Sequence, residues 1–561
     1  MTAGQAPATE GSTCVSENGT RTRLLVLLLS LCVLAACGSS GDDEERGSEL
    51  IDAGTFAGSA PEHIDPALSD SVEAYQVVNA LFDGLTDIDA SDPAHVRIVP
   101  HVAKSYGSND DATQWTFTLR DDVFFSNGEQ VLPSSFARAW ERATEPGFAG
   151  AYGYLFKVIE GGAEKLDGEA RTMTGVSADD STMTLSVKLV APYSNFDALV
   201  SYQTFFPVPS EVDHLEDQGD WEDGRMVGNG PYMLASPRNE REIVLVRNDR
   251  WAGDAKGSRW PDRVERIVFR VSDDPDSAYN AFEAGEADTA SIPPGRAEQA
   301  RADHGTTLDV SLLASSHFLF NERNPVVGGP GNQLLRQAIS QAIDRDEINN
   351  GFYGGTRITP GGLTPPGIPG ATQGLCDYCT YDPDAARAAF GAWQEAGNSQ
   401  REPLPIQFNA NSGFEGLVQI VIDDLARVGI RAVADPRDPE TYPRELNEGA
   451  CVFCRAGWTA DFPAYDNFMY NLFHSDALNG NNYGYVNPKF DAVVDQARST
   501  VDPGRRAELF QDAERIVLNE ETGVVPISWY RGEYAYDRDK IASFPQTPFE
   551  LILWEQVQLA G

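Results

Sequence analysis

The chain has 561 residues, 41% of them hydrophobic and 10% aromatic, so it can bury more than one packed core. Its formal net charge of −42 at pH 7 repels nucleic acid and anionic lipid head groups, which argues against nucleic acid as a partner. Composition therefore predicts an acidic globular protein of two or more lobes.

The first 36 residues form a predicted signal peptide. Two arginines precede an apolar run of thirteen residues, Leu24 to Ala36, whereas a membrane-spanning helix needs about 20. The run ends in Leu-Ala-Ala-Cys, which resembles the lipobox of bacterial lipoproteins and implies lipidation of Cys37 and cleavage just before it. An ordinary signal peptide with a chance Cys is the alternative. Residues 37–49 would be a lipid-anchored linker, holding the protein outside the cytoplasm on the cell membrane.

The body of the chain alternates strand-like and helix-like patterns, which predicts a mixed α/β architecture. Residues 115–119 alternate apolar and polar side chains, as a half-buried strand does, and a Ser-Asn-Gly turn follows at 126–128. We expect further strands at 183–189, 243–247 and 266–271.

Helical periodicity is clearest from Leu334 to Ile343, where apolar residues form one face, and Gly351 is the expected stop. Two more helices are expected, from Asp384 to about Phe390 and from Leu417 to Val428. Residues 359–370 are rich in Pro and Gly and should form a loop.

Common catalytic motifs are absent from the sequence. It contains no G-x-x-x-x-G-K-[ST], G-x-S-x-G or H-E-x-x-H segment, and its seven His are scattered without ligand spacing. We therefore expect no enzyme activity, no metal site and no cofactor.

Four cysteines form two C-x-x-C pairs, Cys376 with Cys379 and Cys451 with Cys454. Export favours disulfides. The second pair lies in a strand-like run, where three residues span roughly 10 Å and the two side chains point to opposite faces, whereas a disulfide needs Cα atoms about 4.4–6.8 Å apart. Cys451 and Cys454 should therefore not bond to each other, and one of them can bond to a Cys of the 376/379 turn. Zinc binding and free thiols are the alternatives.

Short segments follow one another in a distinctive order after residue 60: IDP at 64–66, LFDGL at 81–85, PHVAKS at 100–105, WTFTLR at 115–120, FFSNG at 124–128, GNGPY at 228–232, RN at 247–248 with Trp251, AGEAD at 284–288, RQAI at 336–339, AIDR at 342–345 and YDPDAA at 381–386. Their number, order and spacing resemble the large extracytoplasmic solute-binding proteins of ABC importers, the group that includes oligopeptide- and dipeptide-binding lipoproteins. Asn229 departs from the Thr of the family pattern.

The resemblance implies a two-lobed α/β fold of the periplasmic-binding-protein type, with a hinge, an interlobe ligand cleft and a discontinuous first lobe. Residues 50–290, with an inserted subdomain at about 96–228, and residues 515–561 would form the first lobe; residues 291–514 would form the second. It also implies a monomer that delivers its ligand to an ABC permease and ATPase complex.

The segment from Arg455 to Phe462, RAGWTADF, resembles the R-A-G-W-x-A-D-Y segment of oligopeptide-binding members. By that resemblance, Asp461 pairs with the α-amino group of a peptide. The other implied site residues are Arg455, Gly457, Trp458 and Thr459 from this segment, and Val72 with Tyr152 or Tyr154 from the facing lobe.

Physical chemistry supports an anchor of this kind, because an ammonium buried in a cleft needs a paired carboxylate. The structural alternative is that Trp458 belongs to a core and that Arg455 forms an internal ion pair with Asp461. The expected function is that of a lipid-anchored receptor for oligopeptides or dipeptides. Nickel chelates, haem, oligosaccharides or opines are alternative ligands, all bound within this family, and a secreted hydrolase is a further alternative.

Overall fold

The computed structural model describes residues 49–58, 60–92, 96–148, 150–214, 219–222, 224, 226–239, 241–253, 264–293, 295–410, 412–439, 441–477 and 484–560. The predicted signal peptide, Cys37 and the linker up to residue 48 lie outside the described residues. Within the described ranges, no helix has both the length and the apolar character needed to cross a bilayer.

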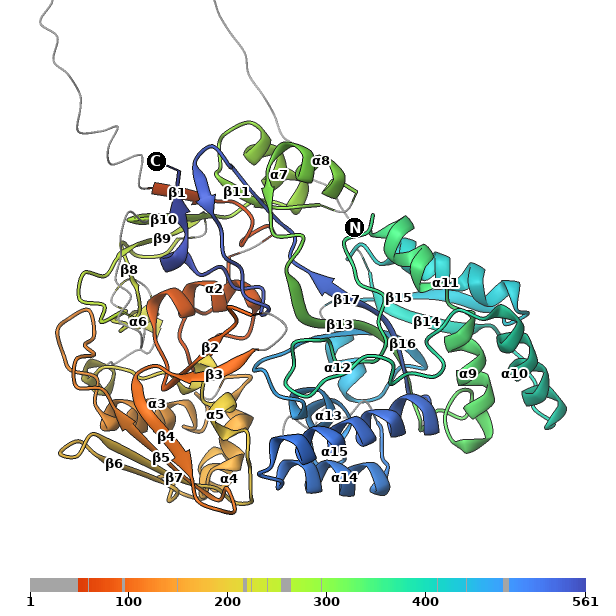
Figure 1. The fold of residues 1–561 in the computed structure, drawn as a ribbon, viewed down its shortest axis with the longest axis horizontal. Helices are drawn as coiled ribbons and strands as arrows, with labels where there is room; N and C mark the ends of the chain where they lie inside the picture. Colours follow the sequence, from red (N-terminus) through yellow and green to blue (C-terminus); the bar gives the residue numbers. More distant parts are fainter. Residues whose placement is uncertain are drawn as a thin grey trace, which may run out of the picture. The chain divides into compact units, whose positions relative to one another are not determined.

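A seven-stranded sheet forms the first lobe, in the order β12-β18-β11-β1-β10-β9-β8 (Figure 1). Its strands are β1 (Glu49–Asp52), β8 (Tyr232–Leu234), β9 (Glu242–Arg247), β10 (Arg266–Arg270), β11 (Thr289–Ser291), β12 (Gly305–Thr306) and β18 (Tyr534–Tyr536). β18 comes from the C-terminal part of the chain yet pairs with both β11 and β12, so the first lobe is discontinuous in sequence.

A four-stranded antiparallel sheet is inserted into the first lobe, in the order β4-β5-β7-β6. Its strands are β4 (Ala103–Ser108), β5 (Gln114–Leu119), β6 (Val176–Asp179) and β7 (Thr184–Lys188). Trp115, Phe117 and Leu119 alternate with polar residues on β5 and pack with Phe136 and Trp140 of α3 (Pro133–Ala143) in the largest core cluster. The strands predicted at 115–119, 183–189, 243–247 and 266–271 are therefore confirmed.

The helix α2 (Val72–Leu81) brings the start of the first lobe toward the site described below. It begins where Ser71 accepts a hydrogen bond from the Ala74 amide at 3.2 Å, which satisfies one amide at the helix start. The hairpin of β2 (Thr86–Asp89) and β3 (Arg97–Pro100) follows it.

A five-stranded sheet forms the second lobe, in the order β15-β14-β16-β13-β17. Its strands are β13 (Ser311–Phe320), β14 (Leu404–Asn409), β15 (Ala432–Arg437), β16 (Phe453–Thr459) and β17 (Val524–Arg531). Neighbouring residues of β13 enter different cores: Phe318 and Phe320 pack with the helices on one face, whereas Leu319 joins the cluster on the other. β13 is therefore buried on both faces, as its nearly continuous apolar sequence requires, whereas the edge strand β15 is partly exposed.

The helices predicted for the second lobe are present. α9 (Gln333–Ala342), α10 (Pro383–Glu395) and α11 (Glu415–Arg427) cover one face of the five-stranded sheet, and α13 (Asp466–Phe473), α14 (Pro488–Arg498) and α15 (Pro503–Arg515) supply the cluster on the other. α10 continues beyond the predicted end because Trp393 extends its buried face. Gly351 is not the stop of α9, since the helix ends at Ala342 and Ile343 has an extended backbone.

The cysteines form disulfides as expected, but the predicted pairing was wrong. Cys376 bonds to Cys379 and Cys451 bonds to Cys454, with Cα–Cα distances of 5.4 and 6.0 Å. The strand β16 begins only at Phe453, and the chain bends at the residue before it, so the second pair is not fully extended. The bend brings the two Cα atoms within the range that a disulfide spans.

The chain passes between the two large sheets twice, from β12 to β13 and from β17 to β18. These connections lie side by side, because the Thr307 amide donates to Tyr534 O at 2.9 Å and the Gly532 amide donates to Val310 O at 2.9 Å. A Cβ at Gly532 would lie 2.6 Å from Thr307 O, so only Gly permits this approach. We propose that the lobes divide at 307–310 and 532–533, in place of boundaries near 290 and 515.

Candidate ligand-binding site

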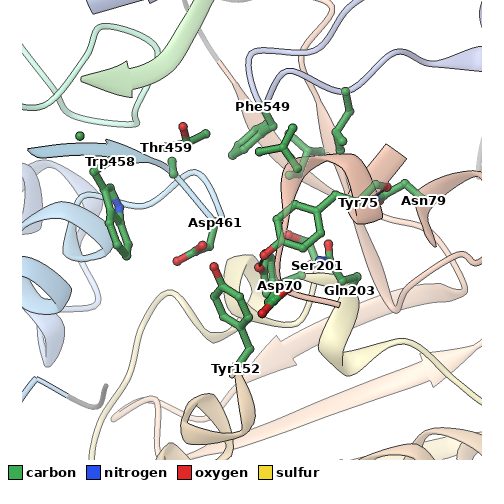
Figure 2. Close-up of a pocket in the computed structure, with 16 residues that line it drawn as sticks. Asp70, Tyr75, Asn79, Tyr152, Ser201, Gln203, Trp458, Thr459, Asp461 and Phe549 are labelled. Atoms are coloured by element: carbon green, nitrogen blue, oxygen red, sulfur yellow. Dashed lines mark hydrogen bonds between the residues drawn. The ribbon is translucent and has the colours of Figure 1, made fainter. Parts of the chain in front are cut away.

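A cavity of about 210 Å³ lies between the two lobes (Figure 2). The end of β16 and the loop after it supply its second-lobe wall, from Gly457 to Asp461. The remaining lining residues are Asp70, Val72, Tyr75, Asn79, Ile88, Tyr152, Ser201, Tyr202, Gln203, Phe549 and Leu551.

Six of the eight predicted ligand-site residues line this cavity: Val72, Tyr152, Gly457, Trp458, Thr459 and Asp461. Tyr154 does not line it, although burial and then the charge of the nearby Asp461 carboxylate raise the pKa of its phenol. In Figure 2 the Tyr152 hydroxyl points toward Asp461, while Tyr75 and Asp70 lie across the cavity from Trp458.

Arg455 is not among the residues that line the cavity. Its guanidinium lies 3.6 Å from the centroid of the Phe414 ring and donates to the Tyr530 hydroxyl at 3.0 Å. Side chains alternate across a strand, so Arg455 and Trp458 point to opposite faces of β16. Among the ion pairs of the described residues, none joins Arg455 to Asp461, so the predicted internal salt bridge does not form.

The Asp461 carboxylate accepts a hydrogen bond from the Asn467 side-chain amide at 2.9 Å, and the Tyr152 hydroxyl points toward it. Burial between the lobes raises its pKa to about 6, because removal from water penalises the ionised form more than these neighbours favour it. A carboxylate that has lost water without gaining a cation is suited to receive one.

Asn467 is a site residue that the sequence motifs did not reveal. Its side-chain oxygen accepts from the Trp458 indole at 2.8 Å and from the Asp461 amide at 3.2 Å. Trp458 is half-buried and oriented by this bond, so it is a wall of the cavity as well as a contact of the neighbouring core.

Four tyrosines surround Asp461 on the first-lobe side: Tyr75, Tyr152, Tyr154 and Tyr202. The Tyr75 and Tyr202 hydroxyls are hydrogen-bonded, and the Tyr152 and Tyr202 rings lie 4.9 Å apart. Burial raises the pKa of each phenol above 10, so all four stay neutral at physiological pH. No local sequence motif marks Tyr75 or Tyr202, because one lies on a helix and the other in a loop far away in the sequence, and they meet only in the folded protein.

The cavity lining is acidic. Asp70 and Asp461 line it, and no Lys, Arg or His is among the described residues that do so. No group of three or more His, Cys, Asp or Glu in the described chain has the arrangement of a metal site. The lining therefore offers hydroxyls, amides and negative charge.

The end of β16 has an open backbone edge beside the cavity. β14 pairs with β16 only at Phe453 and Cys454, and in the described chain no strand continues this pairing. On the opposite edge, the Ala460 amide donates to Leu313 O at 2.9 Å, so alternate residues face β13. The N–H and C=O groups of Gly457 and Thr459 therefore point to the open edge.

Further contacts join the lobes around the cavity. The Asn195 side chain donates to the Asp466 carboxylate at 3.0 Å, and the Arg498 guanidinium lies 4.6 Å from the centroid of the Tyr193 ring. Phe462, directly after Asp461, packs into the core cluster of the first lobe. The lobes are thus in contact on the side of the cavity away from the two connections.

Known proteins resemble the chain along nearly its whole length. The oligopeptide-binding protein OppA of Bacillus subtilis (strain 168) is 24% identical over 529 residues, covering 92% of this chain and 94% of the relative. The periplasmic oligopeptide-binding protein OppA of Escherichia coli (strain K12) is 27% identical over 531 residues, covering 91% and 94%.

The crystal structure of Haemophilus influenzae OppA in complex with the peptide RPPGFSPFR superposes with a TM-score of 0.72 at 24% identity, covering 92% of this chain and 99% of that one. This likeness agrees with the two-lobed fold. The model of the bacterial extracellular solute-binding proteins, family 5 Middle, matches residues 97–480. The chain therefore belongs to the bacterial extracellular solute-binding proteins of family 5.

Proposed function

We propose that this protein is a lipid-anchored extracytoplasmic receptor that binds oligopeptides or dipeptides and delivers them, as a monomer, to an ABC permease and ATPase complex. The observation that carries the proposal is the half-buried Asp461 carboxylate, which lines an interlobe cavity whose described lining residues include no basic side chain. Such a site favours a ligand that brings its own positive charge.

Asp461 is the anchor for the α-amino group. A peptide ammonium would replace the missing countercharge and form charge-assisted hydrogen bonds with the carboxylate. Asp70 lies on the same cavity and strengthens its negative potential. Neutral or anionic solutes would leave Asp461 unpaired, so their binding is disfavoured.

The open edge of β16 forms hydrogen bonds with the peptide backbone. Gly457 and Thr459 can pair with an extended peptide as an added strand would, whatever its side chains are. Trp458 and Phe549 offer apolar surface, and each Å² they bury contributes about 25 cal/mol.

The cavity holds only the amino end of such a ligand. Its 210 Å³ lies below the roughly 300–1,000 Å³ of pockets for drug-sized molecules, so a longer peptide needs the lobes to open further. Rotation about the connections at 307–310 and 532–533 would admit it, and the ligand would favour the closed form by contacting both lobes.

The names of the relatives support peptides over other solutes, since both OppA proteins are oligopeptide-binding proteins and the similar crystal structure holds a peptide. The lipid anchor is inferred from the lipobox-like sequence at Cys37 alone. Nickel chelates, haem, oligosaccharides and opines stay as alternative ligands.

A hydrolase is disfavoured because the one close Ser–His pair that we find in the described chain is not suited to catalysis. Ser315 Oγ lies 3.3 Å from His317 Nδ1, but both residues are buried in β13. Burial and the nearby Arg455 lower the pKa of His317 to about 3, so it is a poor base and no substrate reaches it.

A thermal-shift panel tests the proposal, with di- to pentapeptides, their N-acetylated forms, oligosaccharides and metal chelates. Free-amino peptides should raise the melting temperature, and acetylation should abolish the shift because it removes the charge. Equal shifts from acetylated peptides would refute the amine anchor. Mass spectrometry of ligands that co-purify with the protein supplies an independent check.

A further inference from the structure

We infer that Asn467 is the positioning residue of the ligand anchor: its carboxamide fixes the carboxylate of Asp461 and the indole of Trp458 as one unit. The inference rests on the proposed function, because it explains how that amine anchor is held ready before a ligand arrives. Asn467 does not line the cavity, so it acts through the two residues that do.

One carboxamide makes three hydrogen bonds that no other single side chain at this position reproduces. Its oxygen accepts from Trp458 Nε1 at 2.8 Å and from the Asp461 amide at 3.2 Å, while its nitrogen donates to Asp461 Oδ2 at 2.9 Å. An aspartate could accept but not donate at neutral pH, and a lysine could only donate. The pattern is specific to an amide.

Asn467 itself is rigidly placed. It is fully buried in the first turn of α13, next to Phe468 and Met469, which are core residues. The preceding residue, Asp466, accepts the interlobe hydrogen bond from Asn195. The same helical turn therefore carries one contact that holds the lobes together and one that orients the anchor.

This arrangement leaves one carboxylate oxygen of Asp461 without a bond from Asn467 and favours its ionised state. The titratable groups that face Asp461 from the first lobe are Tyr75, Tyr152, Tyr154 and Tyr202, all neutral between pH 5 and 8, and Asp70 lies across the cavity. The Asn467 amide lowers the pKa of Asp461 against the opposing effect of burial. Its removal should therefore move the titration of Asp461 upward.

The first test measures calorimetric affinity for trialanine from pH 5 to pH 8. Asn467→Ala should weaken binding about ten-fold at pH 7.5, as expected for a lost bond to a charged group, and should shift the pH midpoint of binding upward. Asn467→Ser, which can still accept and donate, should lie between Asn467→Ala and wild type. Asn471→Ala is the matched control, because it truncates a buried Asn one turn later on the same helix.

A ligand-free test uses thermal unfolding of wild type and Asp461→Asn across pH 4 to 8. The difference in melting temperature between the two proteins, followed against pH, reports the titration of Asp461. In an Asn467→Ala or Asn467→Ser background this titration should move to higher pH, whereas Asn471→Ala should leave it in place. Unchanged titration in the Asn467 variants would overturn the inference, as would affinity lost equally at all pH values.

The amine-anchor role of Asp461 and the positioning role of Asn467 can be refuted separately. If Asp461→Asn binds trialanine as wild type does, the proposed amine anchor is wrong. If Asp461→Asn loses binding while Asn467→Ala and Asn467→Ser keep both affinity and pH midpoint, only the role of Asn467 is wrong. If trialanine does not bind wild type, the ligand-free titration still decides whether Asn467 positions Asp461.

Discussion

The Tyr152 hydroxyl of the first lobe points toward the Asp461 carboxylate of the second (Figure 2). The two residues lie 309 positions apart in the sequence and meet only because the lobes are in contact. Asp461 therefore belongs to the interlobe boundary as well as to the cavity, so the protonation of this carboxylate is linked to closure of the lobes.

Ligand affinity should depend on pH. In the proposed function the ionised form of Asp461 pairs with an ammonium, and with its pKa raised to about 6, affinity should fall about ten-fold per pH unit below that value. A peptide amino group deprotonates near pH 7.7–8.0, so affinity should also decline above about pH 8. Titration calorimetry with trialanine at pH 5, 6, 7 and 9 checks this, and a flat profile would contradict it.

Asp461→Asn should stabilise the ligand-free protein at neutral pH. The folded-state pKa lies above the ordinary value of 3.8 for an aspartate, so the folded protein holds the proton more tightly, and the free energy of unfolding falls as pH rises from about 4 to 6. Two pKa units correspond to about 3 kcal/mol, an upper bound for the gain at pH 7.5. Denaturant unfolding at pH 4 and pH 7.5 should show the gain only at the higher pH.

Tyr152→Phe should weaken binding of free-amino peptides several-fold, because it removes the hydroxyl that points toward the Asp461 carboxylate in the cavity. Tyr154→Phe is the matched comparison, since Tyr154 does not line the cavity. We expect Tyr154→Phe to change the calorimetric affinity less than two-fold. The reverse ranking would show that the sequence alternative, Tyr154, is the ligand contact.

Asn195→Ala should speed ligand release although Asn195 does not line the cavity. Its bond to Asp466 joins the lobes, and loss of about 1 kcal/mol from the closed form predicts roughly five-fold faster dissociation with little change in association. Stopped-flow measurement with a fluorescent peptide checks both rates. Asn127→Ala, in a first-lobe turn, is the control, and equal dissociation rates in the two variants would contradict the role of Asn195.

Peptide mapping of unreduced protein should recover Cys376 linked to Cys379 and Cys451 linked to Cys454. Each bond closes a very short loop, so its removal should cost at most about 2 kcal/mol in the chain-entropy model. Fragments that cross-link the 376/379 turn to Cys451 or Cys454 would contradict these pairings.

The sequence by itself determined the family-like order of segments, the strands at 115–119 and 243–247, and the segment around Asp461 that lines the cavity, because local alternation and motif spacing are properties of neighbouring residues. Only the tertiary structure decided that Arg455 contacts Phe414 and Tyr530 instead of lining the cavity, and that a bend before β16 lets Cys451 reach Cys454. The structure alone likewise identified Asn467, Tyr75 and Tyr202 as residues at or beside the cavity. Their roles depend on contacts between segments far apart in sequence, and no local pattern encodes such contacts.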